Sequence, residues 1–320
     1  MEFKRISYKH KNNKPKYYIV NYLRQLIPHI LFQKQLRKKL HAARQIEAIS
    51  KRVAYYNKLS ENIDLKNPLP LSKLKSVPGS KVYFFDLFQY SRFFSQQLKG
   101  YFLFGDVVTV AEQPTFVKSR PINDTNQNSI LLKWNKLRHF MFIKNDTTAF
   151  KDKKNMLVSR GKVHQSQTHR IKFLEMYFKH PMCNIGKVNN NDLNSLWKVP
   201  RLTINQQLTY KFILCLEGND VASNLKWVMS SNSIAVMTKP KFETWFMEGL
   251  LKPDFHYIQI KDDYSDLEDR LNYYITHTQK AMDIIHNANQ YVSQFKDHKQ
   301  EELISLCTLE KYFIQTNQKV

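Results

Sequence analysis

Two polar stretches of the sequence carry residues that can bind an anionic ligand. The first is "SRGKVHQSQTHR" at 159–170, whose basic residues surround a glycine: Arg160, Lys162, His164, His169 and Arg170, with Gly161. Arginine offers parallel N–H donors to phosphate oxygens, and glycine lets a ligand approach the backbone closely. The stretch therefore predicts a phosphate site. A solvated basic loop without a ligand is the alternative.

The second stretch is "EGNDVAS" at 217–223, which follows an apolar run directly. Glu217 is placed to take the hydroxyls of a sugar or ribose, as acids do at strand ends in nucleotide-binding folds. Gly218 permits a tight turn, and Asn219, Asp220 and Ser223 can cap a helix or contact a ligand. A helix cap without a ligand is the alternative.

Familiar catalytic motifs are missing from the sequence. It contains no GxGxxG, GxxxxGK[ST], HExxH or GxSxG motif, so standard dinucleotide, P-loop, zinc-protease and hydrolase chemistry are not indicated. It also lacks an Asp-x-Asp pair. A metal ion holding a diphosphate is therefore not expected, and cationic side chains would have to take that role.

Alternating strands and helices position the two stretches. We expect strands at 156–161, 211–216, 233–237 and 256–260, and helices at 168–178, 221–229, 242–250 and 279–295. A further helix would start at a capping box formed by Ser265 and Glu268. This alternation predicts a parallel sheet, and ligands bind at the carboxyl ends of parallel strands, beside helix N-termini. Both polar stretches would then lie at that edge.

The first half of the chain is less regular. Residues 17–59 have helical periodicity, with a break expected at Pro28. Strand-like runs follow at 81–87, 100–110 and 115–120, whereas 128–143 has mixed periodicity. The polar stretch 145–155 is the candidate domain boundary, since 320 residues suit two domains.

The net charge of +23 is concentrated at one end. Residues 1–60 hold fifteen Lys and Arg against two acids, Glu2 and Glu47, which suggests a nucleic acid or an anionic membrane as partner. The three cysteines show no CxxC spacing and are expected to be reduced. Without a long apolar stretch or a signal-peptide core, we expect a cytoplasmic protein.

Four segments resemble glycosyltransferase family 90, the CAP10-like family. "FILCLEGNDVASNLKWVMSSNSIAVM" at 212–237 resembles its core signature, with Glu217, Gly218 and Lys226 matching. "VSRGKVHQSQTHR" is similar to its upstream arginine segment, and the run at 240–271 is the longest match. "VKSRPI" at 117–122 is typical of the bacterial lipopolysaccharide and lipooligosaccharide core branch.

The resemblance implies an α/β, GT-B-like fold with two Rossmann-like lobes. The residue pattern adds a basic helical N-terminal extension, which lies outside the resemblance. Residues 1–66 would be that extension, 67–150 the rest of the acceptor-side lobe, 151–300 the donor lobe, and 301–320 a C-terminal helix or tail. Arg160 and Arg170 would converge on one pyrophosphate beside the 217–226 turn. The implied donor-binding residues are Arg160, Gly161, Arg170, Glu217, Gly218, Asn219, Ser223 and Lys226.

An inverting transfer needs a general base for the acceptor hydroxyl. The resemblance places it in "YFLFGDVVTV", which makes Asp106 the candidate catalytic residue, with Glu112 and Asp124 as alternatives. A plain turn residue is the alternative role for Asp106. Asn224 stands where the family usually has an arginine, which keeps an inactive relative open as an alternative.

Together these observations predict an inverting, metal-independent transferase. It would move a hexose from UDP-glucose or UDP-galactose to a lipid-linked core oligosaccharide at the inner face of the membrane. The basic N-terminal helices would hold it at an anionic membrane surface, although they are equally consistent with ordinary packed helices. A nucleic-acid-binding protein is the rival reading, but no RNA- or DNA-binding signature supports it, so no nucleic acid is expected.

Overall fold

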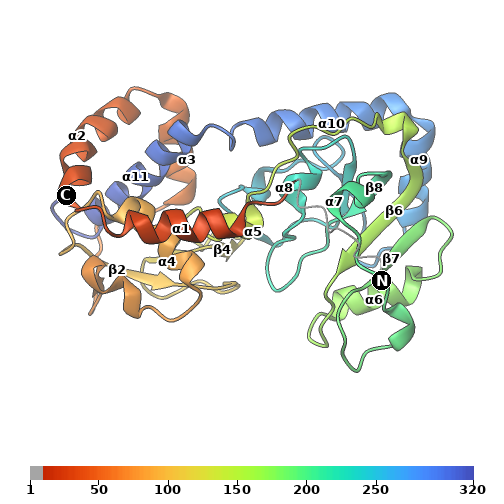
Figure 1. Cartoon of the computed structure of the whole chain (residues 1–320), viewed down its shortest axis with the longest axis horizontal. Coiled ribbons are helices and arrows are strands. Elements are labelled where there is room, and N and C mark those ends of the chain that lie inside the picture. Colours follow the sequence, from red (N-terminus) through yellow and green to blue (C-terminus); the bar gives the residue numbers. More distant parts are fainter. Residues whose placement is uncertain (1–9) are drawn as a thin grey trace. The chain divides into compact units, whose positions relative to one another are not determined.

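The computed structural model describes residues 10–320, which divide into two compact units (Figure 1). Unit 1 comprises residues 139–240 and 250–294 with the described residues 10–12, and unit 2 comprises residues 13–138, 241–249 and 295–320. Both contain helices and parallel strands, so the predicted α/β class is confirmed. The GT-B arrangement and the four-segment division stay predictions. Residues 1–9 of the basic N-terminal segment lie outside the described residues.

Unit 1 is built on a five-stranded sheet in which every pair is parallel, as predicted. The spatial order is β11-β9-β8-β6-β7. The strands β8 and β9 are buried along their whole length, which explains why they read as uninterrupted apolar runs. The strands are β6 (Lys154–Gly161), β7 (Cys183–Lys187), β8 (Tyr210–Leu214), β9 (Ile234–Met237) and β11 (Ile258–Gln259).

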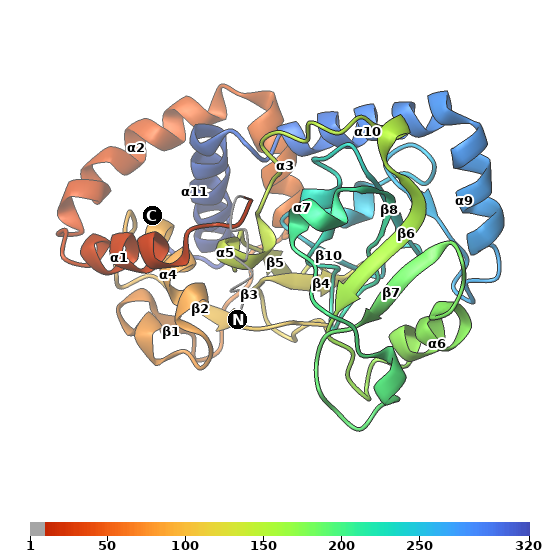
Figure 2. The same cartoon turned by 45° about the vertical axis from the view of Figure 1, so that its right-hand side comes forward.

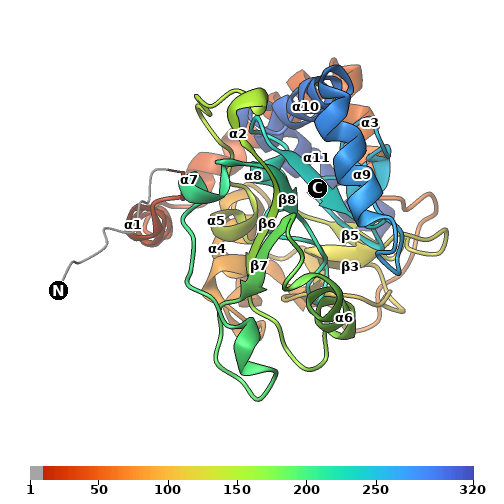
Figure 3. The ribbon, with the colours of Figure 1, turned by 90° about the vertical axis from the view of Figure 1, so that its right-hand side faces the viewer.

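Helices cover this sheet and share its apolar core. Apolar residues of α6, α9 and α10 join those of the strands in one cluster, and Figure 3 shows α6 and α9 on one side of β6 and β8 and α7 on the other. The helices are α6 (Thr168–Tyr177), α7 (Ile204–Gln207), α8 (Leu225–Val228), α9 (Leu267–Thr276) and α10 (Thr278–Ser293), with 3-10 turns η2 (Phe150–Asp152) and η3 (Ser195–Trp197).

Two expectations for unit 1 are wrong in detail. The predicted helix 221–229 forms only as α8, because residues 217–224 make a turn. The predicted capping box does not form: Asp266, not Ser265, precedes α9, and its side chain makes no cap hydrogen bond. Ser265 instead donates its backbone N–H and its hydroxyl to the carboxylate of Asp263.

Unit 2 contains a four-stranded sheet of order β1-β2-β3-β5 and a separate antiparallel pair of β4 and β10. The pairs β2–β3 and β3–β5 are parallel, and β1–β2 is antiparallel. The predicted helix 242–250 is wrong, because its first residues form β10 against β4. The elements are β1 (Leu69–Pro70), β2 (Lys99–Leu103), β3 (Thr115–Val117), β4 (Ser119–Pro121), β5 (Ser129–Leu131), β10 (Phe242–Thr244) and η4 (Glu248–Leu250).

The helical part of unit 2 follows the predicted break at Pro28, which separates α1 from α2. The predicted strand 81–87 is wrong: it lies in α4, whose first turn Ser80 caps by accepting from the Val82 N–H. The helices are α1 (Lys14–Arg24), α2 (Ile30–Arg44), α3 (Glu47–Tyr56), α4 (Lys81–Ser91), α5 (Lys136–His139) and α11 (His298–Gln315), with η1 (Leu71–Ser76). Among the helices of residues 10–320, none has the length and apolar character needed to cross a membrane.

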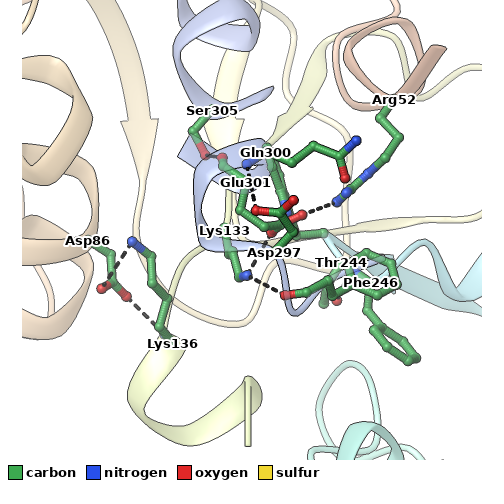
Figure 4. A network of polar contacts seen from close by, with 12 residues as sticks. Arg52, Asp86, Lys133, Lys136, Thr244, Phe246, Asp297, Gln300, Glu301 and Ser305 are labelled. Atoms are coloured by element: carbon green, nitrogen blue, oxygen red, sulfur yellow. Dashed lines mark hydrogen bonds and ion pairs between the residues drawn. The ribbon is translucent and has the colours of Figure 1, made fainter. Parts of the chain in front are cut away.

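A buried ionic network holds distant parts of unit 2 together. Glu301 of α11 accepts from the guanidinium of Arg52 in α3 and from the ammonium of Lys133, both at 2.6 Å (Figure 4). The indole N–H of Trp245 also donates to Glu301, at 2.8 Å. These four side chains are almost fully buried, so the carboxylate neutralises two cations that would be costly to bury unpaired.

A second buried ion pair fixes the short sheet of unit 2. Arg120 of β4 donates to Glu243 of β10 at 2.7 Å, and neither side chain is exposed. The same guanidinium donates to the carbonyls of Tyr55 (2.8 Å) and Ser129 (2.9 Å). The arginine of "VKSRPI" therefore stabilises the fold of unit 2.

Candidate active site

The strand order of unit 1 places a topological switch between β6 and β8. These strands are neighbours, yet the chain leaves β6 for β7 on one side and leaves β8 for β9 on the other. Read in chain order, the sheet has the arrangement 2-1-3-4-5, which separates the turns that follow the first and third strands. In open α/β sheets, ligands bind at this point. The two polar stretches follow β6 and β8, so they flank the switch.

Arg170, in the first turn of α6, joins the two turns. Its Nε donates to the carbonyl of Glu217 and its Nη2 to that of Leu216, both at 2.8 Å. Its Nη1 donates to the carbonyl of Lys162 at 2.8 Å, across on the other turn. One planar cation therefore holds the turn after β6 against the turn after β8.

The two glycines of these turns make room for this guanidinium. A Cβ atom on Gly218 would lie 3.4 Å from Arg170 Nη2, and one on Gly161 would lie 3.7 Å from Nη1. These are ordinary contact distances, so a methyl group would fit, whereas a larger side chain would have to share the space of the cation. The structure thus brings Gly161, Arg170, Gly218 and the backbone of Glu217 together, and their role in donor binding stays a prediction.

Two further contacts connect the same turns. His169 Nε2 lies 2.9 Å from the carbonyl oxygen of Glu217. The amide of Gln167 donates to the Asn219 side chain at 3.3 Å and accepts from the His164 backbone N–H at 3.1 Å. Gln167 was not identified from the sequence, and only its position just before α6 hints at a role. Asn219 thus belongs to the cluster, as predicted.

Arg160 lies elsewhere. Its guanidinium donates to the Asn184 carbonyl and to the Asn184 side chain, each at 2.7 Å, and to the carbonyl of Pro200 at 3.0 Å. Because successive strand residues point to opposite faces of a sheet, the side chain of Arg160 points away from the face toward which Gly161 is directed. Burial lowers the pKa of Arg160. The structure brings Arg170, but not Arg160, to the 217–226 turn.

Three further residues at the second turn are buried or half-buried: Ser223, Asn224 and Lys226. Lys226, in α8, is fully buried, and its charge acts on the thiol of Cys215, whose pKa is raised by burial. The Asn224 side chain donates to the carbonyl of Leu214 at the end of β8, at 2.9 Å. Ser223 is half-buried beside it. Asn224 therefore ties the second turn to the end of β8, whereas Lys226 lies in the protein interior.

Asp106 lies in unit 2, beyond the carboxyl end of a parallel strand. Leu103 is in register with Val117, and Asp106 follows through Gly105, whose φ of +126° favours glycine. The carboxylate, about a third exposed, forms an ion pair with Lys118, which is 1% exposed. The ion pair with Lys118 favours the ionised form of this carboxylate and holds it beyond the end of the strand.

The two alternative acids lie on the surface of unit 2. Glu112 and Asp124 are both exposed. The backbone carbonyl of Glu112 accepts from the Asn128 side chain at 2.8 Å, which ties its backbone to the start of β5. Neither carboxylate has an ion pair like that of Asp106 among the contacts of the described residues.

The cysteines are not activated for chemistry. Burial raises the pKa of Cys183 and of Cys307 to about 12, so both thiols stay protonated at neutral pH. No group of three or more His, Cys, Asp or Glu side chains within residues 10–320 is arranged to hold a metal ion.

Comparison with known proteins shows the enzyme family to which the chain belongs. The sequence model of glycosyl transferase family 90 matches residues 125–302, more than half of the chain. The chain belongs to glycosyltransferase family 90. This match spans both turns of the switch between β6 and β8 and leaves Asp106 outside. The residues that hold Arg170 are therefore part of a glycosyltransferase core.

Relatives support the same assignment. The protein named O-glucosyltransferase LpsA from Dichelobacter nodosus is 41% identical over 268 residues, which cover 83% of each chain. Two viral proteins without an assigned function match a shorter part. Protein 035R of Invertebrate iridescent virus 3 is 31% identical over 115 residues, and protein 179R of Invertebrate iridescent virus 6 is 30% identical over 105 residues. These cover 35% and 31% of the chain, and 10% and 9% of the viral proteins.

Proposed function

We propose that this glycosyltransferase moves glucose or galactose from a uridine diphosphate sugar to the core of a lipopolysaccharide or lipooligosaccharide. Glucose is the first candidate, because the bacterial relative with 83% coverage is named an O-glucosyltransferase. The transfer would invert the anomeric carbon and need no metal ion. The acceptor would be lipid-linked, at the cytoplasmic face of an anionic membrane.

The observation that carries the proposal is the bridge made by Arg170 at the switch between β6 and β8. A diphosphate bound there would lie next to a guanidinium and to the N-terminus of α6, whose aligned peptide groups add partial positive charge. Positive charge at this place would stabilise the nucleoside diphosphate as it leaves. Glu217 and Asn219, on the same turn, would contact sugar or ribose hydroxyls.

The proposed reaction is a single displacement. The acceptor hydroxyl oxygen forms a bond to the anomeric carbon while the bond from that carbon to the diphosphate oxygen breaks. The hydroxyl proton passes to the carboxylate of Asp106, and the electron pair leaves with the nucleoside diphosphate. In this scheme unit 1 is the donor lobe and unit 2 the acceptor lobe of a GT-B enzyme.

Thermal-shift measurements with nucleotide sugars test the donor class. We expect UDP-glucose or UDP-galactose to raise the unfolding temperature, and RNA and NAD to leave it unchanged. The same shift in the presence of EDTA would agree with metal-independent binding. A protein that responds to no nucleotide sugar, or to RNA instead, would refute the proposal.

A transfer assay tests the rest. The protein is incubated with the responding donor and with core oligosaccharide that lacks its terminal sugar, and the product is analysed by NMR. We expect a β-linked sugar from the α-linked donor. An α-linked product would exclude inversion, and transfer to water alone would remove the acceptor assignment.

A further inference from the structure

Eight large apolar side chains are exposed where α1 meets α2. They follow one another between residues 19 and 31 and are 40–78% exposed, with Leu26 the most exposed at 78%. We call them the α1–α2 corner: Ile19, Val20, Tyr22, Leu23, Leu26, Ile27, Ile30 and Leu31. Figure 2 shows α1 and α2 meeting at this turn, at the left of the view. A contiguous apolar patch of this kind marks an interaction surface.

The corner is exposed because its helices are anchored through their other face. The hydroxyl of Tyr17 donates to Asp86 of α4 at 2.7 Å. Asn21, one turn further along α1 on the same face, is buried. On α2, Gln33 donates to the carbonyl of Phe94 at 3.0 Å. Polar and aromatic groups thus face the body of unit 2, while the aliphatic side chains face outward.

Basic residues flank the corner along the chain. Residues 13–46 of unit 2 contain no acid, and they contain eight Lys and Arg: Lys14, Lys16, Arg24, Lys34, Arg37, Lys38, Lys39 and Arg44. Two of them, Lys39 and Arg44, pair with Glu302 and Glu310 of α11. A cavity of about 260 Å³ adjoins α1, where Tyr22 and Gln25 line it together with Lys75 and Lys81. An apolar patch inside a field of positive charge is complementary to an anionic lipid surface.

We propose that the α1–α2 corner inserts into an anionic lipid bilayer, with its aliphatic side chains below the head groups and the surrounding lysines at the phosphates. The inference deepens the proposed function, since it assigns membrane contact to one named surface. A second copy of the chain is a poor occupant, because a symmetric contact would bring two acid-free basic segments together. Insertion and charge attraction contribute separately, so the two can be separated by experiment.

Sedimentation of the full chain with vesicles tests this. The vesicles contain either phosphatidylglycerol or phosphatidylcholine alone. Because salt screens charge attraction but not insertion, we expect binding to the anionic vesicles to weaken at 0.5 M NaCl without disappearing. The double variant Leu26→Gln, Ile30→Gln should bind at least about tenfold more weakly than the unmodified protein at both salt concentrations. Lys34→Gln with Lys38→Gln should weaken binding mainly at low salt.

The matched control changes two apolar residues that are comparably exposed in unit 1. Leu196 is 66% and Met282 50% exposed, and Leu196→Gln with Met282→Gln should leave vesicle binding unchanged. Three results would overturn the inference: no binding to anionic vesicles, unchanged binding by the corner variant, or a soluble dimer that the corner variant dissociates.

A separate readout keeps this inference distinct from the proposed function. The thermal shift with UDP-glucose reports donor binding, and we expect the corner variant to keep it while losing vesicle binding. If the unmodified protein binds vesicles through the corner but responds to no nucleotide sugar, the proposed function fails and the corner assignment stands.

Discussion

Replacing Arg170 gives the most direct test of the proposed site. Its three hydrogen bonds, each 2.8 Å long, join the turn after β6 to the turn after β8. A hydrogen bond from a charged donor contributes about 1.5 kcal/mol at the low end, which suits a half-buried side chain. Three such bonds, less the roughly 2 kcal/mol of side-chain entropy that alanine recovers, leave about 2–3 kcal/mol.

If that energy keeps the two turns in the geometry that binds a diphosphate, Arg170→Ala should weaken UDP binding about 30-fold to 150-fold. Arg170→Lys separates geometry from charge. A lysine keeps the positive charge, but its single ammonium cannot span three carbonyls in one plane. We therefore expect the lysine variant to bind UDP no more than about threefold more tightly than the alanine variant.

Isothermal titration calorimetry with UDP and UDP-glucose measures these affinities, and urea unfolding shows that each variant is folded. Arg201→Ala is the control, because it removes an exposed positive charge from unit 1. Arg160→Ala should weaken UDP binding less than Arg170→Ala does, because the contacts of Arg160 are with Asn184 and Pro200. Full affinity in Arg170→Lys would refute the geometric argument, and full affinity in Arg170→Ala would move the donor site elsewhere.

Three further predictions follow from side chains outside the switch. Asp106→Asn should lower kcat by about 10²–10⁴-fold without changing UDP affinity. An equal loss of kcat in Glu112→Gln would contradict the assignment of Asp106 as the general base. Glu301→Ala should lower the free energy of unfolding by about 3–5 kcal/mol in urea, because it leaves two buried cations unpaired, and a loss below about 1 kcal/mol would contradict this. Cys183 and Cys307, whose pKa values are raised to about 12, should react with iodoacetamide far more slowly at pH 8 in the folded than in the unfolded protein, and equal rates by mass spectrometry would exclude their burial.

Sequence periodicity predicted the parallel sheet of unit 1, because buried parallel strands are continuous apolar runs bounded by turns. It missed β7, whose residues Cys183–Lys187 include a glycine and a lysine that only the packing of the sheet explains. Residues 81–87 look like a strand because aromatic residues favour strands, but Ser80 caps a helix there and tertiary contacts bury its aromatic rings.

At the candidate site, the sequence predicted which turns come together better than it predicted the direction of side chains. Gly161, Arg170, Glu217 and Gly218 meet as expected, because both turns leave neighbouring parallel strands. Arg160 does not join them, because the alternation of side chains along β6 directs it to the other face of the sheet. The sequence alone does not tell which face of the sheet carries the site. The supporting role of Gln167 depends on a contact across 52 positions of sequence, which no local pattern encodes.

The chain order of the network around Glu301 has a consequence for biosynthesis. The cations of Arg52 and Lys133 are made before the carboxylate of Glu301 that neutralises them. A nascent chain on the ribosome therefore carries both charges without their counter-ion until Glu301 has been added. Unit 2 therefore cannot complete this network until α11 has been made.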